Sequence, residues 1–384
     1  MISLGAGRAD RGVIGSTGDT WRDFAFIWQH LATVSLLLAG APVAIGVSGG
    51  KDSCAAAIST IEYLDSIGHK GPRVLVHSDL GRVEWKQSLP VCERLAERLG
   101  VELIVVRRAA GDMMDRWLVR WENNVERYAA LSCVKVILPW STPTMRFCTS
   151  ELKVAVICRE LVKRFPGQTI VNACGIRRAE SDGRKNAPVA KVQAKLTNKK
   201  NRTTGIDWHP IAHWSTPDVF RFLAARGCEL HEAYTRYGVS RVSCAFCIMQ
   251  NEADMTASAS CPDNSDVGRE MVDLEIASTF AFQGSRWLGD VLYHLLTDEQ
   301  RAGLAVAKER AARREAIEAR IPEHLLYTKG WPTVMPTRDE AELLAGVRRE
   351  IAAELDIKVA CTTADEVIDR FAELMRLKDE RDAR

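Results

Sequence analysis

Six consecutive residues, between a short apolar run and a helix-forming stretch, have the composition of a phosphate-binding loop. Ser-Gly-Gly-Lys-Asp-Ser occupies residues 48–53, directly after the run Val-Ala-Ile-Gly-Val at 43–47, which predicts a buried strand. Glycines let a backbone approach a phosphate closely, and the free N–H groups and the dipole of a following helix attract an anion. Lys51 adds positive charge, while Ser48 and Ser53 add hydroxyl donors. The alternative is a plain glycine turn before a helix, but the complete pattern favours phosphate binding.

A carboxylate follows the second predicted strand, over residues 73–77. Asp79 stands in the segment His-Ser-Asp-Leu-Gly that begins at His77. A carboxylate at the carboxyl end of a strand, beside a phosphate loop, suits Mg²⁺ or a nucleotide hydroxyl. It can equally cap a turn, so the residue types leave both interpretations open.

Two further segments place cations where anions bind. Arg146 and Lys153 lie at either side of a predicted helix start, where cations oppose the helix dipole, and this favours a phosphate partner. Arg177 and Glu180 follow the strand predicted over 169–174. Arginine suits bidentate phosphate contacts, and the glutamate could orient an arginine or bind a ribose hydroxyl. The alternative for the first segment is a helix start around a buried cysteine. The alternative for the second is a surface loop whose charges pair with each other.

The chain has 11 cysteines, of which four could meet at one site. Cys244 and Cys247 form a Cys-x-x-Cys pair, which is either a redox dithiol or half of a metal site. Cys261 follows fourteen residues later, and Cys148 lies on a loop that should face the same region. Four thiolates suit a [4Fe–4S] cluster or a tetrahedral Zn²⁺ ion. Unrelated core cysteines are the alternative.

The segment 182–205 is strongly basic, with seven lysines and arginines against one aspartate. Because it lacks aromatic residues and apolar spacing, we expect a flexible loop over the nucleotide site. Such a loop could grip a triphosphate or the backbone of a nucleic acid, or it could simply be solvated.

Length, charge and composition limit the number of domains and the location of the protein in the cell. A length of 384 residues suggests about two domains, and a net charge of +2 leaves nucleic-acid binding to local arguments. Residues 1–20 lack the apolar core of a signal peptide, and 31–47 is too short and broken to span a membrane. We therefore expect a cytoplasmic protein whose cysteines are not disulfide-bonded.

Short apolar strands alternate with helices through the first two thirds of the chain. Strands are predicted at 43–47, 73–77, 101–106 and 169–174, and helices at 21–39, 52–67, 84–99, 113–131, 150–165 and 216–226. This alternation predicts an α/β fold with a mostly parallel twisted sheet and helices on both faces. Further helices are predicted within 266–320 and 338–381. We divide the chain into a poorly ordered N-terminus (1–20), a nucleotide domain (21–250) and a helical C-terminal region (251–384).

These motifs, in this order, resemble those of the PP-loop ATP pyrophosphatases of the adenine-nucleotide α-hydrolase-like superfamily, and among them the 3′-phosphoadenylylsulfate (PAPS) reductase-like enzymes. The loop at 48–53 is similar to the PP-loop, and Asp79-Leu-Gly to the Asp-x-Gly of those reductases. Residues 146–153 resemble their R-x-C-T-x-x-L-K pattern and 175–181 their G-x-R-x-x-E-S signature. The resemblance covers roughly residues 40–250. It implies that ATP is cut between its α- and β-phosphates, with AMP left on the substrate.

One departure from the reductases is decisive. They carry a late Glu-Cys-Gly-Leu/Ile-His segment whose cysteine attacks sulfur, whereas the late cysteine here, Cys361, stands in a different sequence. The chain therefore looks like the ATP pyrophosphatases of DNA phosphorothioation (Dnd/Ssp) systems. Their implied task is to adenylate a DNA backbone phosphate so that sulfur from a cysteine desulfurase can replace an oxygen. Three alternatives stay open: a sulfonucleotide reductase using another thiol, a tRNA-thiolating or amide-forming enzyme, and a non-catalytic nucleotide sensor or DNA-binding module.

The resemblance also implies three groups of site residues. The catalytic residues would be Lys51, Asp52, Arg146, Lys153 and Arg177. ATP and Mg²⁺ would be held by Ser48, Gly49, Gly50, Lys51, Asp52, Ser53, His77, Asp79, Gly175, Arg177, Glu180 and Ser181. An iron–sulfur cluster, in preference to Zn²⁺, would be held by Cys148, Cys244, Cys247 and Cys261.

Overall fold

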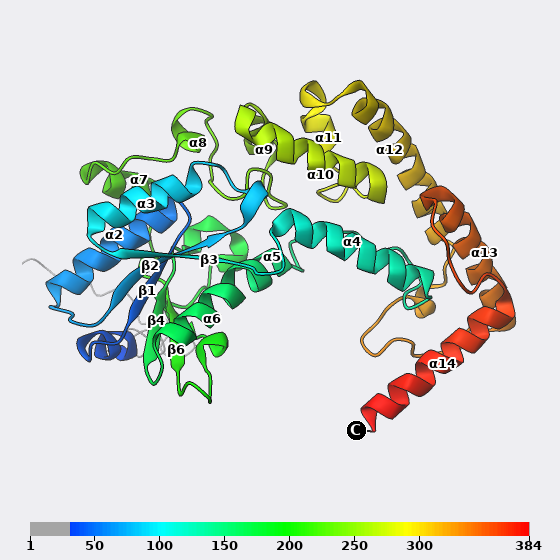
Figure 1. Cartoon of the computed structure of the whole chain (residues 1–384), viewed down its shortest axis with the longest axis horizontal. Coiled ribbons are helices and arrows are strands. Elements are labelled where there is room, and N and C mark those ends of the chain that lie inside the picture. The colour runs from blue at the N-terminus through cyan, green and yellow to red at the C-terminus, as the bar shows by residue number, and fades with distance from the viewer. Residues whose placement is uncertain (1–30, 384) are drawn as a thin grey trace, which may run out of the picture.

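A six-stranded sheet lies in one half of the molecule in the computed structural model, which describes residues 31–383 (Figure 1). Its strands are β1 (Val43–Val47), β2 (Arg73–Asp79), β3 (Glu102–Arg107), β4 (Thr169–Ala173), β5 (Ala190–Val192) and β6 (Thr204–Trp208). They lie in the order β3-β2-β1-β4-β6-β5, and only the β5–β6 pairing is antiparallel. The predicted α/β fold with a mostly parallel sheet is confirmed. The segment 1–20 and the first part of the helix predicted over 21–39 lie outside the described residues, while 31–38 are helical.

Helices cover both faces of the sheet. One apolar cluster joins alternate β1 residues, Val43 and Ile45, to helices α2 (Lys51–Ser66), α3 (Ser88–Leu99) and α7 (Thr216–Ala225). A second cluster joins Ala44, on the opposite face of the same strand, to α6 (Ala155–Arg164). Because β1 is central and buried on both faces, its sequence is a continuous apolar run.

The basic segment 182–205 was predicted as a flexible loop, and this prediction is wrong for much of it. Residues 190–192 form the edge strand β5, and a turn at Ala194–Leu196 places Leu196 in the core under α6. The following strand β6, Thr204–Trp208, pairs with β4 and was not predicted. Thr204 and Asp207 interrupt its apolar run, so the strand pattern is weak in the sequence.

The remaining longer helices, of eight residues or more, form an arm that leads away from the sheet (Figure 1). They are α4 (Met113–Ala129), α9 (Glu252–Ala259), α10 (Ser265–Ser278), α12 (Asp298–Glu318), α13 (Arg338–Leu355) and α14 (Ala364–Asp382). One apolar cluster holds residues from both sides of position 250, and another joins the end of α4 to α13 and α14. The division into domains at residue 250 stays a prediction. Within residues 31–383, no helix is long and apolar enough to cross a membrane.

Candidate nucleotide-binding site

The loop at residues 48–50 connects β1 to the first turn of α2 and is closed by its own side chains. Gly49 has φ +72°, and a Cβ there would lie 3.0 Å from the carbonyl oxygen of Ser88, so glycine is required. The Ser53 hydroxyl donates to the Gly50 carbonyl at 2.8 Å and accepts from the Ser48 backbone N–H at 3.1 Å. The loop is therefore a compact turn that begins a helix at the carboxyl edge of the sheet.

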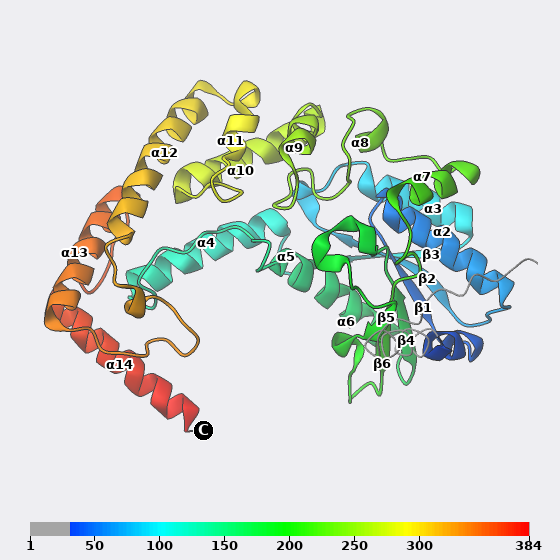
Figure 2. The same ribbon diagram turned by 180° about the vertical axis from the view of Figure 1, so that it is seen from behind.

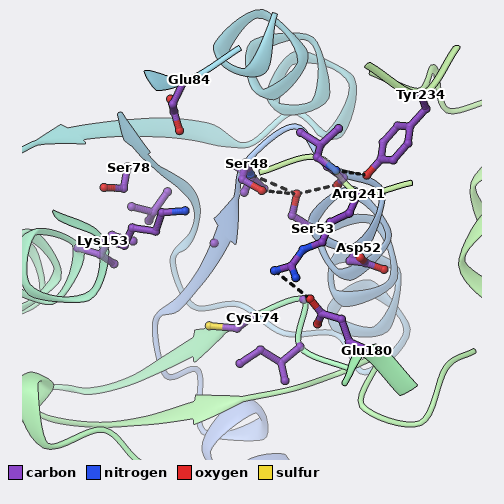
Figure 3. Close-up of a pocket in the computed structure, with 18 residues that line it drawn as sticks. Ser48, Asp52, Ser53, Ser78, Glu84, Lys153, Cys174, Glu180, Tyr234 and Arg241 are labelled. Atoms are coloured by element: carbon purple, nitrogen blue, oxygen red, sulfur yellow. Dashed lines mark hydrogen bonds and ion pairs between the residues drawn. The ribbon is translucent and has the colours of Figure 1, made fainter. Parts of the chain in front are cut away.

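A cavity of about 280 Å³ opens beside this loop, at the carboxyl ends of β1, β2 and β4 (Figure 3). Its polar side chains come from several distant segments of the chain. They belong to Ser48, Asp52, Ser53, Ser78, Glu84, Lys153, Cys174, Glu180, Tyr234 and Arg241. Ligands in open parallel sheets bind at this edge, so the cavity lies where the fold favours a nucleotide.

Asp52 is held between two buried cations. Its Oδ2 lies 3.2 Å from Lys51 Nζ, and its Oδ1 accepts from Arg177 Nε at 2.6 Å. The Arg177 guanidinium, 2% exposed, also donates to the Trp214 carbonyl at 3.1 Å and to the Thr216 hydroxyl at 3.3 Å. The structure thus directs Arg177, predicted as a phosphate ligand, toward Asp52, and neither it nor Lys51 lines the cavity.

Lys153 faces the cavity from an irregular helical turn (Figure 3). The helix predicted over 150–165 begins with a π-helical turn, Ser150–Val154, before α6. Such turns often occur at functional sites. Burial opposes the charge on Lys153, but electrostatic interactions with Cys244 and Glu84 raise its pKa overall. The side chain is therefore a cation aimed at the cavity.

Glu84 connects the cavity to the strand residue His77. The ring of His77, 1% exposed, donates from Nδ1 to the Val47 carbonyl and from Nε2 to Glu84, both at 3.1 Å. Burial opposes the protonated ring, yet hydrogen bonds to Cys92 and Glu84 raise its pKa to about 10. Glu84, not His77, lines the cavity, and its role is not visible in the sequence because it belongs to no motif.

Other predicted nucleotide ligands are distributed around the cavity. Asp79 lines a neighbouring cavity of about 370 Å³, where it accepts from Gly81 N at 2.7 Å and pairs with Arg107. Glu180 lines the first cavity and pairs with Arg184 and with Arg241, whose Nη2 lies 3.3 Å away. Gly175 also lines this cavity, whereas Ser181 and Arg146 are exposed outside it.

The predicted cluster ligands are only partly brought together. Cys148, Cys244 and Cys247 lie close enough to interact electrostatically with Lys153. Cys261 is instead buried in an apolar cluster that Tyr237 packs against. Burial raises the pKa of the Cys244 thiol, and the backbone N–H of Met249 donates to Cys247 Sγ at 3.5 Å. Within the described chain no three His, Cys, Asp or Glu residues are arranged to hold a metal. The arrangement therefore does not form the predicted four-cysteine site, and we derive no chemical step through a cluster.

The cavity residues missed by sequence reasoning include Tyr234 and Arg241. The Tyr234 hydroxyl accepts from the backbone N–H groups of Lys51 and Val242, and burial raises its pKa to about 12. Arg241 precedes the Cys-x-x-Cys pair and reaches back to Glu180. Their only sequence signal is their position shortly before that pair.

The sheet order, the glycine loop after β1 and the cavity beside it define a Rossmann-like α/β protein of the PP-loop type. Residues 42–250, more than half of the chain, match the phosphoadenosine phosphosulfate reductase domain, and the chain belongs to that family. This confirms the PAPS reductase-like resemblance; the narrower assignment to DNA phosphorothioation stays a prediction. No match was found among curated proteins.

Three solved structures are similar to the chain, each with a low TM-score. PAPS reductase from Candida auris, in a phosphate complex, is 14% identical with a TM-score of 0.36, covering 61% of this chain and 98% of its own. The U34-tRNA thiolase NcsA from Methanococcus maripaludis, with its [4Fe-4S] cluster, is 14% identical with a TM-score of 0.36. The match covers 71% of this chain and 79% of the thiolase. FMN adenylyltransferase from Candida glabrata, in complex with FMN and the ATP analogue AMPCPP, is 16% identical with a TM-score of 0.34. The match covers 61% of this chain and 68% of the adenylyltransferase.

Proposed function

We propose that the protein is a cytoplasmic ATP pyrophosphatase that adenylates an acceptor, a DNA backbone phosphate, for sulfur insertion. The observation that carries this proposal is the intact Ser-Gly-Gly-Lys-Asp-Ser loop at the mouth of a polar cavity on the carboxyl edge of the sheet. The loss of the reductase cysteine segment supports a reaction other than sulfonucleotide reduction. A cysteine desulfurase is the proposed source of sulfur.

In the proposed reaction an acceptor oxygen attacks the α-phosphorus, and the bond to the bridging oxygen breaks. Pyrophosphate then leaves with the electron pair of that bond. The loop holds the β- and γ-phosphates, while Lys153 and Arg241 face the cavity as cations that can neutralise the developing charge. Each Asp52 oxygen keeps an unused lone pair, so this carboxylate fits as a ligand of Mg²⁺. When bound, Mg²⁺ would supply charge neutralisation on the leaving group.

Pyrophosphate release from ATP tests the proposal. We expect release by the purified full chain to rise with DNA, and to fall roughly 100-fold or more in Lys51→Ala and Asp52→Ala. Lys70→Ala removes an exposed lysine before β2, outside the cavity, and is the matched control. Unchanged release in both loop variants would contradict the proposal.

Parallel arms separate the alternatives. Stimulation by tRNA instead of DNA would favour a thiolase, and thioredoxin-dependent sulfite release from PAPS would favour a reductase. Tight ATP binding without pyrophosphate would favour a sensor. An iron count and absorption spectrum after anaerobic purification would test whether the protein binds the [4Fe–4S] cluster that the sequence predicts.

A further inference from the structure

Positive charge is concentrated in one part of the chain. The whole protein has a net charge of +2, but residues 146–202 contain fourteen lysines and arginines and four aspartates and glutamates. This segment therefore has an excess of ten positive charges, and the rest of the chain has a net charge of −8. Such an asymmetry indicates a local surface for a polyanion, because the molecule as a whole would not attract one.

Part of this segment forms an open groove between α6 and the turn that follows β5. The groove has a volume of about 410 Å³ and holds three cations, with no carboxylate among its lining residues. Those residues are Ala155, Cys158, Arg159, Val162, Lys163, Lys195, Asn198 and Asn201. Figure 2 shows α6 beside β5 and β6, the elements that flank the groove. We call it the α6 groove.

The three cations are free to meet a ligand from solvent. Arg159, Lys163 and Lys195 are all exposed. Arg159 and Lys163 are four residues apart on α6, so they share one face of the helix, with their Cβ atoms about 6 Å apart. This spacing is comparable with that of neighbouring phosphates on one strand of a nucleic acid. Lys199, Lys200 and Arg202 are exposed on the adjoining turn and extend the positive surface.

The α6 groove is physically connected to the nucleotide cavity. Lys195 Nζ donates to the carbonyl oxygen of Ser150 at 2.9 Å. Ser150 begins the π-helical turn that presents Lys153 to the nucleotide cavity. A chain of phosphates in the groove would therefore pass beside the turn that faces the reacting nucleotide.

We propose that the α6 groove binds the sugar–phosphate backbone of a polynucleotide and leads it toward the nucleotide cavity. The proposed function supplies the purpose of this binding, which is to bring a polynucleotide to the nucleotide cavity; to that extent this proposal rests on it. The absence of carboxylates from the lining, the open exposure of three cations and the further cations beyond them favour an extended polyanion over one small anion. An acidic protein surface is the competing partner, and the test includes it.

The test measures binding of duplex DNA to the full chain by fluorescence anisotropy, without ATP, over a range of salt concentrations. We expect the double variant Arg159→Glu/Lys163→Glu to bind at least about 10-fold more weakly, with the slope of log K against log salt reduced by about 2. Lys195→Ala should weaken binding by a smaller factor. Lys70→Glu/Lys358→Glu reverses two exposed lysines outside the groove and keeps the same net charge, so it should bind like the native protein.

The outcomes are distinct. Arms with single-stranded DNA and tRNA identify which polynucleotide is preferred. Equal binding and equal salt slope in the two double variants would overturn the proposal, as would stronger binding of a polyglutamate peptide than of any nucleic acid. Basal pyrophosphate release without DNA should be unchanged in the groove variant. If the native protein releases no pyrophosphate but binds DNA through the groove, the proposed function fails and the groove proposal stands.

Discussion

The hydroxyl oxygen of Tyr234 accepts a hydrogen bond from the backbone N–H of Lys51 at 3.2 Å. It accepts a second from the N–H of Val242, also at 3.2 Å. Lys51 is the first residue of α2, and its N–H, which has no partner within the helix, is one of the donors that a phosphate oxygen would use. The tyrosine oxygen therefore occupies a position that suits a phosphate oxygen, and Lys51 Nζ lies 5.6 Å from the centre of the same ring.

We expect Tyr234→Phe to bind ATP and inorganic pyrophosphate more tightly than the native protein. The native protein must break the hydroxyl contacts before a phosphate can reach these donors, whereas the variant leaves both N–H groups unpaired. Since one hydrogen bond contributes about 1 kcal/mol net, the dissociation constant should fall roughly 5-fold. Isothermal titration calorimetry measures this change directly.

Tyr237→Phe is the matched control for that prediction. Tyr237 does not line the nucleotide cavity, so nucleotide affinity should not change. Weaker binding by Tyr234→Phe would show that the hydroxyl contacts the nucleotide instead of competing with it.

The buried pair of His77 and Glu84 predicts a dependence of stability on pH. The pKa of His77 is raised to about 10 in the folded protein, against about 6.5 in an unfolded chain. The protonated ring therefore stabilises the fold fully below about pH 6.5, and this contribution is lost as pH rises toward 10. We expect Glu84→Gln to lower the free energy of unfolding by about 2 kcal/mol at pH 6, and by progressively less toward pH 10.

Chemical denaturation at several pH values measures this difference. Glu62→Gln is the control, because Arg226 lowers the pKa of Glu62 and so places its pH dependence on the acid side. The stability difference between the native protein and Glu62→Gln should be constant from pH 6 to pH 10. A constant difference for Glu84→Gln as well would count against a charged His77.

The sheet and the phosphate loop could be predicted because contiguous residues determine them. The run 43–47 is apolar on both faces of a central strand, and the glycine at position 49 is required by the close approach of Ser88. Strand β6 could not be predicted in the same way, because its burial depends on packing beside β4, which only the fold provides.

The cavity walls were much harder to predict than the loop. Glu84, Tyr234 and Arg241 come from segments with no motif, and the fold alone brings them to the loop. Arg177 is the opposite case: its motif was found, but the sequence did not show that its guanidinium contacts Asp52, and its role at a phosphate stays a prediction. Residue type and spacing predict that an arginine lies near a site. Its hydrogen-bond partners depend on carbonyls and carboxylates that other segments bring to it.

A buried arginine of α13 joins α13 to the end of α4 within the helical arm. The Arg348 guanidinium, 1% exposed, donates to the carbonyl oxygens of Tyr128 at 2.8 Å and Ala129 at 2.9 Å, the last two residues of α4. It also donates to the Ala360 carbonyl at 2.6 Å. The Tyr128 and Ala129 carbonyls also accept from the backbone N–H groups of Leu131 and Ala360. Because the last carbonyls of a helix carry partial negative charge, the additional cation at this end is stabilising.

We expect Arg348→Ala to lower the free energy of unfolding by roughly 3 kcal/mol, because the buried guanidinium and its hydrogen bonds are lost and the Ala360 carbonyl is left without a donor. Limited proteolysis should then cut the segment between α13 and α14 faster than in the native protein. Arg349→Ala removes the neighbouring exposed arginine, and its effect should stay within about 0.5 kcal/mol. Arg348→Lys should be intermediate, since an ammonium group cannot span these carbonyls as a planar guanidinium does. Equal stability of the Arg348 and Arg349 variants would mean that apolar packing alone holds α13 and α14 to α4.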